Sequence, residues 1–167
     1  MPSNVKTIVI PSFINSGAEI DSSRQYRYAL WRIWDNTKPV VLFVGLNPST
    51  ADEHVNDSTL NKCIHFAASW GFGGVYMANL FAYRATEPED MKRAKDPIGT
   101  DNDRWLMKLT KRCDLVVAAW GNHGTFLDRS AAVKQQLGAL NCLKQNKSGE
   151  PAHPLYQPNT SSYKPYL

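Results

Sequence analysis

Three short runs of apolar, largely β-branched residues punctuate the chain, at positions 40–44, 75–79 and 115–120. Runs of this length are typical of strands that are buried on both faces of a sheet. Over 57–71, 100–111 and 128–140 the spacing of apolar residues instead predicts amphipathic helices. Strands that alternate with helices predict an α/β domain with three layers (α/β/α). Helices would then cover both faces of a mainly parallel central sheet of about four strands.

The flanking segments carry weaker signals. Residues 1–23 contain β-formers interrupted by Pro11 and Gly17, which predicts an edge strand or an arm leading into a core at 24–167. Residues 24–34 alternate in a way typical of a half-buried strand, which we expect beside the 40–44 strand. Residues 141–144 suit a short fourth strand, and the four prolines of 151–167 predict an ordered loop over the sheet edge. The whole chain, 1–167, is predicted to be a single domain.

Composition narrows the class of protein. With 167 residues, 43% of them hydrophobic, the chain is long enough to bury a core of its own. Its net charge of +4 would help a polyanion to approach but is far below that of a nucleic-acid coat protein. Its three cysteines are widely separated and indicate neither a disulfide framework nor a metal site. No apolar run reaches the roughly 18 residues needed to span a bilayer, and no secretory leader is recognisable, so we expect a cytoplasmic protein without a membrane partner.

Polar turns follow the predicted central strands. The first strand ends at Gly45 and passes through Leu46 and Pro48 into a turn that carries Asn47, Ser49 and Thr50. The third ends at Trp120 and is followed by Gly121, Asn122 and His123. Open α/β sheets bind ligands beyond the carboxyl ends of their strands, so we expect these turns to meet in one cleft.

Asn79 is unusual because it closes an otherwise apolar strand. A buried amide has two donor hydrogens and two acceptor lone pairs to satisfy. Either the backbone or a ligand supplies the partners, and the sequence leaves both possibilities open.

Arginines are expected around this cleft. Together with nearby aromatic residues, their side chains would pair with phosphates or stack on bases, although arginine stems also simply cover apolar surface. The arginines that we predict to contribute to a basic rim are Arg24, Arg27, Arg32, Arg84 and Arg129.

Four motifs carry a resemblance to a known family. They are LNPSTAD (46–52), NLFAYRAT (79–86), AAWGNHG (118–124) and HPLY (153–156). In this order, from about Arg24 to the C-terminus, they resemble a domain family of unknown function found in bacterial and phage proteins. That family brings no established activity.

The same order of motifs is similar, more remotely, to the uracil-DNA glycosylase superfamily. That resemblance implies its fold and a glycosylase-like hydrolase that acts on DNA in preference to RNA, or on free nucleotides, without a metal or cofactor. Asn47 would position the attacking water, and His153 would stabilise the departing base. The implied substrate-binding residues are Gly45, Leu46, Pro48, Ser49, Thr50, Asn79, Arg84, Trp120, Gly121, Asn122, His123 and Pro154.

The chain also departs from the superfamily pattern. Leu155 follows His153-Pro154 where the superfamily has serine, and Ser49 replaces the glycine that ends its first motif. Two hypotheses therefore remain. The first is an enzyme that hydrolyses an N-glycosidic bond or acts on a modified base, and the second is a non-catalytic module that binds a nucleotide or DNA with the same pocket.

Overall fold

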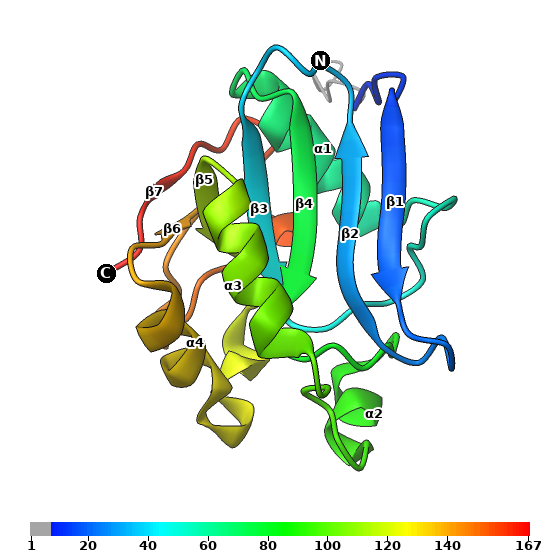
Figure 1. Cartoon of the computed structure of the whole chain (residues 1–167). Helices are drawn as coiled ribbons and strands as arrows, with labels where there is room; N and C mark the ends of the chain where they lie inside the picture. Colours follow the sequence, from blue (N-terminus) through cyan, green and yellow to red (C-terminus); the bar gives the residue numbers. More distant parts are fainter. Residues whose placement is uncertain (1–7) are drawn as a thin grey trace, which may run out of the picture.

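The computed structural model describes residues 8–167 and shows an α/β protein built around a seven-stranded sheet (Figure 1). The first seven residues of the predicted N-terminal arm lie outside the described residues. The sheet has the strand order β1-β2-β4-β3-β5-β6-β7. Its strands are β1 (Asn15–Ile20), β2 (Arg27–Ile33), β3 (Val40–Gly45), β4 (Gly74–Asn79), β5 (Leu115–Ala118), β6 (Asn141–Cys142) and β7 (Lys164–Pro165).

Strand directions in the sheet are mixed. The pairs β4–β3, β3–β5 and β5–β6 are parallel, whereas β1–β2, β2–β4 and β6–β7 are antiparallel. The α/β class is therefore confirmed, and so are the three adjacent, parallel central strands. The prediction of a mainly parallel sheet of about four strands is wrong. A hairpin (β1–β2) extends one edge of the sheet antiparallel to β4, and the C-terminal tail adds β7 at the other edge.

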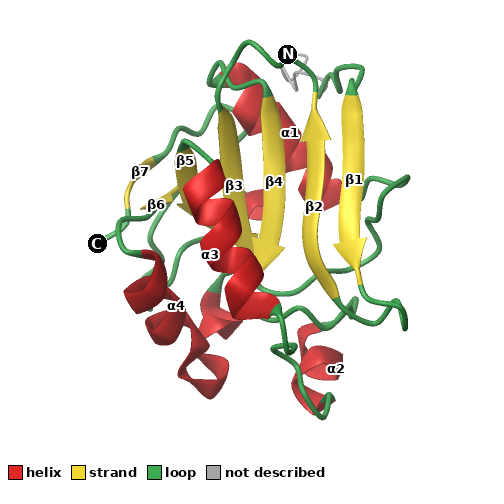
Figure 2. Ribbon diagram, viewed as in Figure 1, coloured by secondary structure: helices red, strands yellow, loops and turns green. Residues whose placement is uncertain are grey.

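Helices lie on both faces of this sheet. Figure 2 shows α1 (Ser58–Ser69) behind the sheet and α3 (Asn102–Arg112) in front of it. The helix α4 (Arg129–Leu137) follows the 3-10 turn η1 (Asn122–Asp128), and a second 3-10 turn, η2, spans Pro154–Tyr156. The short helix α2 (Pro88–Arg93) was not predicted; Pro88 lies in its first turn, where proline is tolerated.

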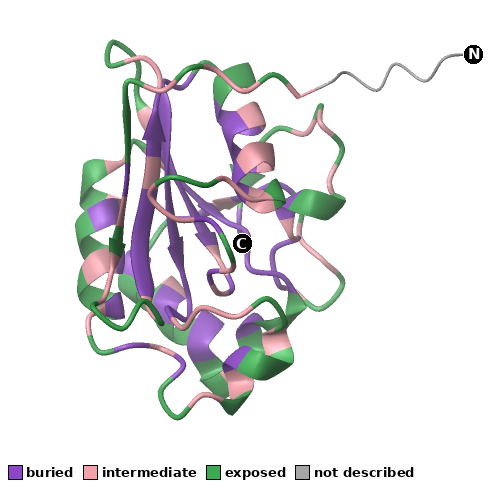
Figure 3. Ribbon diagram, turned by 90° about the vertical axis from the view of Figure 1, so that its right-hand side faces the viewer, coloured by how far each residue is buried: buried purple, intermediate pink, exposed green. Residues whose placement is uncertain are grey.

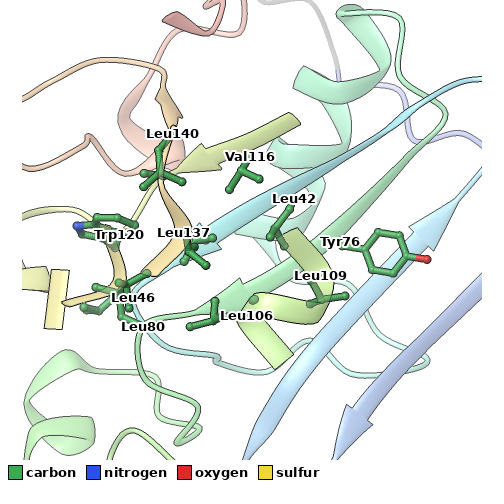
Figure 4. Close-up of a cluster of buried hydrophobic side chains, with 14 of the residues drawn as sticks. Leu42, Leu46, Tyr76, Leu80, Leu106, Leu109, Val116, Trp120, Leu137 and Leu140 are labelled. Carbon is green, nitrogen blue, oxygen red and sulfur yellow. The ribbon is translucent and has the colours of Figure 1, made fainter. Parts of the chain in front are cut away.

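Alternate residues of β3 point to opposite faces, and each face has its own core. Leu42 packs in the cluster that contains Leu106 of α3, drawn in Figure 4. Phe43 packs in a second cluster with Leu60 of α1. Figure 3 shows that the buried residues gather in the strands and on the helix sides that face them. Full burial of one such apolar side chain contributes roughly 1.5–3 kcal/mol to the free energy of folding. The buried faces of the helices therefore stabilise their packing on the sheet.

Two local predictions need correction. The strand predicted in 24–34 is β2, but β4 lies between it and β3, so it is not adjacent to the 40–44 strand. At the N-terminus the edge strand is Asn15–Ile20, which lies in the more polar part of the predicted segment, because an edge strand with one open side tolerates polar residues. None of the helices in residues 8–167 is long and apolar enough to cross a membrane.

Candidate functional site

A cavity of about 770 Å³ opens at the carboxyl ends of β3, β4 and β5, on the face of the sheet that α1 covers. Its inner part is walled by apolar side chains from β2, β3, β4 and α1, including Leu30, Phe43, Met77 and Leu60. Twelve of the fourteen site residues predicted from the sequence line it, and their roles remain predictions. These are Gly45, Leu46, Asn47, Ser49, Thr50, Asn79, Trp120, Gly121, Asn122, His123, His153 and Pro154.

The turn after β3 is fixed by the amide of Asn47. Its Nδ2 donates hydrogen bonds to the carbonyl oxygens of Pro48, at 3.1 Å, and Ala85, at 2.8 Å. The second bond ties this turn to the segment that follows β4. Among residues 8–167, Asn47 Oδ1 accepts no hydrogen bond, so it is the atom of this amide that remains able to accept one from a water or a ligand.

Asn79 closes β4 and is 4% exposed. Its Nδ2 is buried without a hydrogen-bond partner among residues 8–167, which is costly in a folded protein. Its backbone is well held, because the buried Asn102 donates from Nδ2 to the carbonyl oxygen of Asn79 at 2.9 Å. Of the two possible sources of partners for this amide, the backbone of the described residues supplies none to Nδ2.

His153 precedes η2 and is held in one tautomer. Its Nδ1 accepts a hydrogen bond from the backbone N–H of Leu155 at 3.2 Å. The proton of the neutral ring therefore lies on Nε2, which is a donor. Burial lowers the pKa of His153, an effect that the negative charge of Asp57 opposes. The neutral ring with its Nε2–H donor is accordingly the favoured form at neutral pH.

Trp120 and Gly121 shape the wall next to His153. The Trp120 Nε1 donates to the buried carboxylate of Glu150 at 3.0 Å, and the same carboxylate accepts from Ser130 Oγ at 2.7 Å. Gly121 has a φ of +73°, a left-handed conformation that favours glycine and turns the chain away from β5 into η1. A Cβ on Gly121 would lie 3.9 Å from His153 Cβ, so the two segments are in contact.

The exposed residues Asn122 and His123 lie at the cavity wall with neighbours of their own. The Oδ1 of Asn122 accepts hydrogen bonds from Asn146 Nδ2 at 3.0 Å and from Ser148 Oγ at 2.6 Å. His123 Nδ1 lies 3.0 Å from Lys92 Nζ. These contacts organise η1 and leave the inner cavity to Asn47, Asn79 and His153.

Two residues on the cavity wall were not predicted to have these positions. Arg27 was predicted to be part of a basic rim, but it is 4% exposed and lines the cavity. Asp57 begins the segment predicted as a helix; its Oδ1 accepts from the N–H of Leu60 at 2.9 Å and caps α1, and the residue also lines the cavity. The signals in the sequence were an arginine within the alternating 24–34 strand and an acidic residue at the start of the predicted 57–71 helix.

Two predicted site residues do not line the cavity. Pro48 is buried within the turn, and the guanidinium of Arg84 donates to the backbone oxygens of Ser49, at 3.3 Å, and Arg24, at 3.1 Å. Arg84 therefore braces the turn from outside the cavity.

The predicted basic rim is wrong. Arg32 is 1% exposed and donates to Asn56 Oδ1 and to backbone oxygens, and Arg129 is 4% exposed and donates to Leu80 O and Asp103. Arg24 is exposed but pairs with Glu53 at 3.0 Å. These guanidinium groups pair with carboxylates or donate hydrogen bonds to backbone carbonyls of the protein, and these partners come from tertiary contacts rather than from local sequence.

The wall offers little metal or thiol chemistry. Within residues 8–167 there is no group of three or more His, Cys, Asp or Glu residues that could hold a metal ion. Cys63 lies on the inner wall, and burial raises the pKa of its thiol, so this group stays protonated and acts as an apolar surface.

Comparison with known proteins connects this chain to one family. Residues 27–155, which include all the strand-end turns described above, match the model of the family described as "Protein of unknown function (DUF1643)". Comparisons with curated proteins and with solved structures found no match. Since the family model covers most of the sequence, the chain belongs to this family of proteins of unknown function.

Proposed function

We propose that the cavity binds a nucleobase and that the protein hydrolyses an N-glycosidic bond, in the manner of the uracil-DNA glycosylases that its motifs resemble. The observation that carries the proposal is the buried amide of Asn79, whose Nδ2 lacks a partner beside an apolar wall. An apolar inner pocket that ends in an amide suits the faces and the hydrogen-bonding edge of a base. The uracil-DNA-glycosylase-like fold, with its three layers, is part of this proposal.

Each residue has a chemical task in this reaction. The bond between C1′ and the base nitrogen breaks, and its electron pair leaves with the base. The oxygen of a water held by Asn47 Oδ1 bonds to C1′, and the proton that the water loses balances the one that the departing base gains. His153 donates a hydrogen bond from Nε2–H to the base as negative charge develops on it. The neutral state of the His153 ring suits this task, because the ring carries the Nε2–H donor and, being uncharged, needs no counter-ion in the pocket.

The charges on the cavity wall favour a free nucleoside or nucleotide over duplex DNA as the substrate. Arg27 is the only lysine or arginine among the residues that line the cavity in the described part of the chain, and Asp57 and Glu87 add negative charge to the wall. Proteins that bind DNA strongly usually place several cations along the phosphate backbone. Binding that hardly changes with salt concentration is therefore expected, whereas a steep loss of affinity with salt would favour DNA.

The second hypothesis, a non-catalytic nucleotide-binding module, has one observation in its favour. An amide at position 47 holds a water but cannot take its proton, so the reaction depends on the electrophilicity of the sugar cation alone.

The decisive experiment is to incubate the pure protein with nucleosides, nucleotides and oligonucleotides that contain uracil, hypoxanthine or 5-hydroxymethyluracil, and to measure released base by mass spectrometry. We expect release by the wild type, and none by His153→Ala. His65→Ala is the matched control, because His65 contacts the backbone oxygen of Asn159 and does not line the cavity. Tight binding to one compound without any release would decide for the binding module.

A further inference from the structure

Arg27 is deeply buried, yet the described residues do not satisfy all of its hydrogen-bond donors. It begins β2, and the guanidinium is enclosed at the cavity wall. Its Nη1 donates to the carbonyl oxygen of Ala51 at 3.0 Å, whereas its Nε is buried with no hydrogen-bond partner in the described part of the chain. Burial lowers the pKa of Arg27 to about 10, with the negative charge of Asp57 opposing the shift, so the group is still a cation at neutral pH.

A second buried arginine of the same strand shows what a structural arginine looks like in this protein. Arg32 is 1% exposed, and all three of its guanidinium nitrogens donate hydrogen bonds, to Asn56 Oδ1 and to backbone carbonyl oxygens. It does not line the cavity. The open donor of Arg27 is therefore a property of its position at the cavity wall and not of buried arginines in β2 generally.

Arg27 and Asn79 lie at the same end of two neighbouring strands. β2 and β4 are antiparallel neighbours, so the start of β2, at Arg27, meets the end of β4, at Asn79. Each residue is 4% exposed, and each carries one buried donor without a partner. Two such donors in one cavity call for a ligand that presents acceptor atoms to the inner wall.

We propose that Arg27 is a ligand-binding residue whose guanidinium is held for an acceptor of the bound base that carries negative charge. The inference rests on the proposed function and adds that the pocket prefers a base in its anionic form. When the glycosidic bond breaks, the departing base has this charge, delocalised onto its ring nitrogens and carbonyl oxygens. A cation in a water-poor pocket then interacts more strongly with the departing base than with the neutral base of the bound substrate.

The ligand preference is tested with two free bases. At pH 7.5, 5-nitrouracil has lost a ring proton and is an anion, whereas uracil is neutral. Calorimetric titration of the full chain is expected to show tighter binding of 5-nitrouracil, by about tenfold or more, as a charge-assisted hydrogen bond implies. Arg27→Met should lose the preference, and Arg27→Lys, which keeps the charge, should retain part of it.

Thermal unfolding without ligand supplies a second readout. Arg27→Met should keep or raise the melting temperature, because it removes a buried, underbonded charge and leaves an apolar chain of similar length. Arg32→Met should lower it clearly, because it breaks a satisfied network. A loss of stability in Arg27→Met as large as that in Arg32→Met would overturn the proposal.

Further results would also refute this role for Arg27. They are an unchanged preference for 5-nitrouracil in Arg27→Met, and a wild type that binds neither base. The proposed function can fail separately: a wild type that prefers the anion but releases no base from any substrate excludes hydrolysis and leaves the role of Arg27 standing. Release of base by the wild type, together with full preference in Arg27→Met, excludes only the role of Arg27.

Discussion

The amide of Asn79 occupies the space that a side chain at position 45 would need. Gly45 and Asn79 are paired in register across the parallel strands β3 and β4, and a Cβ atom on Gly45 would come within 2.8 Å of Asn79 Oδ1. The glycine that ends the central strand therefore makes room for the amide that faces the cavity. Local sequence alone indicates only that the strand ends at this glycine.

Gly45→Ala is expected to displace the Asn79 amide and to weaken base binding by tenfold or more, an effect of about 1.4 kcal/mol. The free energy of unfolding should also fall, since real Cβ atoms do not approach an oxygen this closely. Titration calorimetry and urea unfolding measure the two effects. In an Asn79→Ala background the stability cost of Gly45→Ala should largely disappear. Equal costs in both backgrounds would show that the clash lies elsewhere.

Asn79→Ala and Asn102→Ala should behave in opposite ways. Asn79 has an unpartnered Nδ2, so its removal should change the free energy of unfolding by less than about 1 kcal/mol while abolishing base discrimination. Asn102 donates to the backbone oxygens of Asn79 and Leu80, and its removal should cost about 1–3 kcal/mol. Urea unfolding separates the two variants. A large loss of stability in Asn79→Ala would make this amide a structural group.

At position 47, aspartate should be worse for stability than alanine. Asn47 Nδ2 donates to the carbonyl oxygens of Pro48 and Ala85, and a carboxylate would place negative oxygens against both. We expect Asn47→Asp to lose about 1–3 kcal/mol in urea unfolding and Asn47→Ala to lose less. Asn47→Ala should also release no base, because it removes the oxygen that would hold the water. An aspartate variant that is as stable as wild type would show that the turn tolerates a rearranged side chain.

His153 should make the protein less stable in mild acid. Burial lowers the pKa of His153 from its ordinary value of 6.5, so the unfolded chain binds this proton at a higher pH than the folded protein does. Between the lowered pKa and 6.5, the free energy of unfolding therefore rises with pH. Below the lowered pKa, the destabilisation by His153 is complete and no longer changes with pH. Urea unfolding over this range should show a steeper loss for wild type than for His153→Asn. Parallel pH profiles would contradict the assignment. Base release should persist below pH 6.5, because the neutral ring is the proposed donor.

Local patterns determined the backbone of this protein well. Each central strand is a continuous apolar run, so residues that are neighbours in the chain are enough to predict its burial on both faces. The first helix has its N-cap at Asp57, and Gly71 beyond its end has a φ of +87°, because both signals depend only on the adjacent turn. The convergence of the strand-end turns also follows, since parallel strands bring their carboxyl ends to one edge.

Tertiary structure alone decided the strand directions at the sheet edges and the fate of the charged side chains. The antiparallel pairing of β2 with β4, and of β7 with β6, depends on which strand edges the central parallel strands leave open. Arg27, Arg32 and Arg84 have the same charge in the sequence. They end at a cavity wall, in a closed hydrogen-bond network, and on the outside of a turn, respectively. Burial and hydrogen-bond partners come from residues distant in the chain, so no local pattern encodes them.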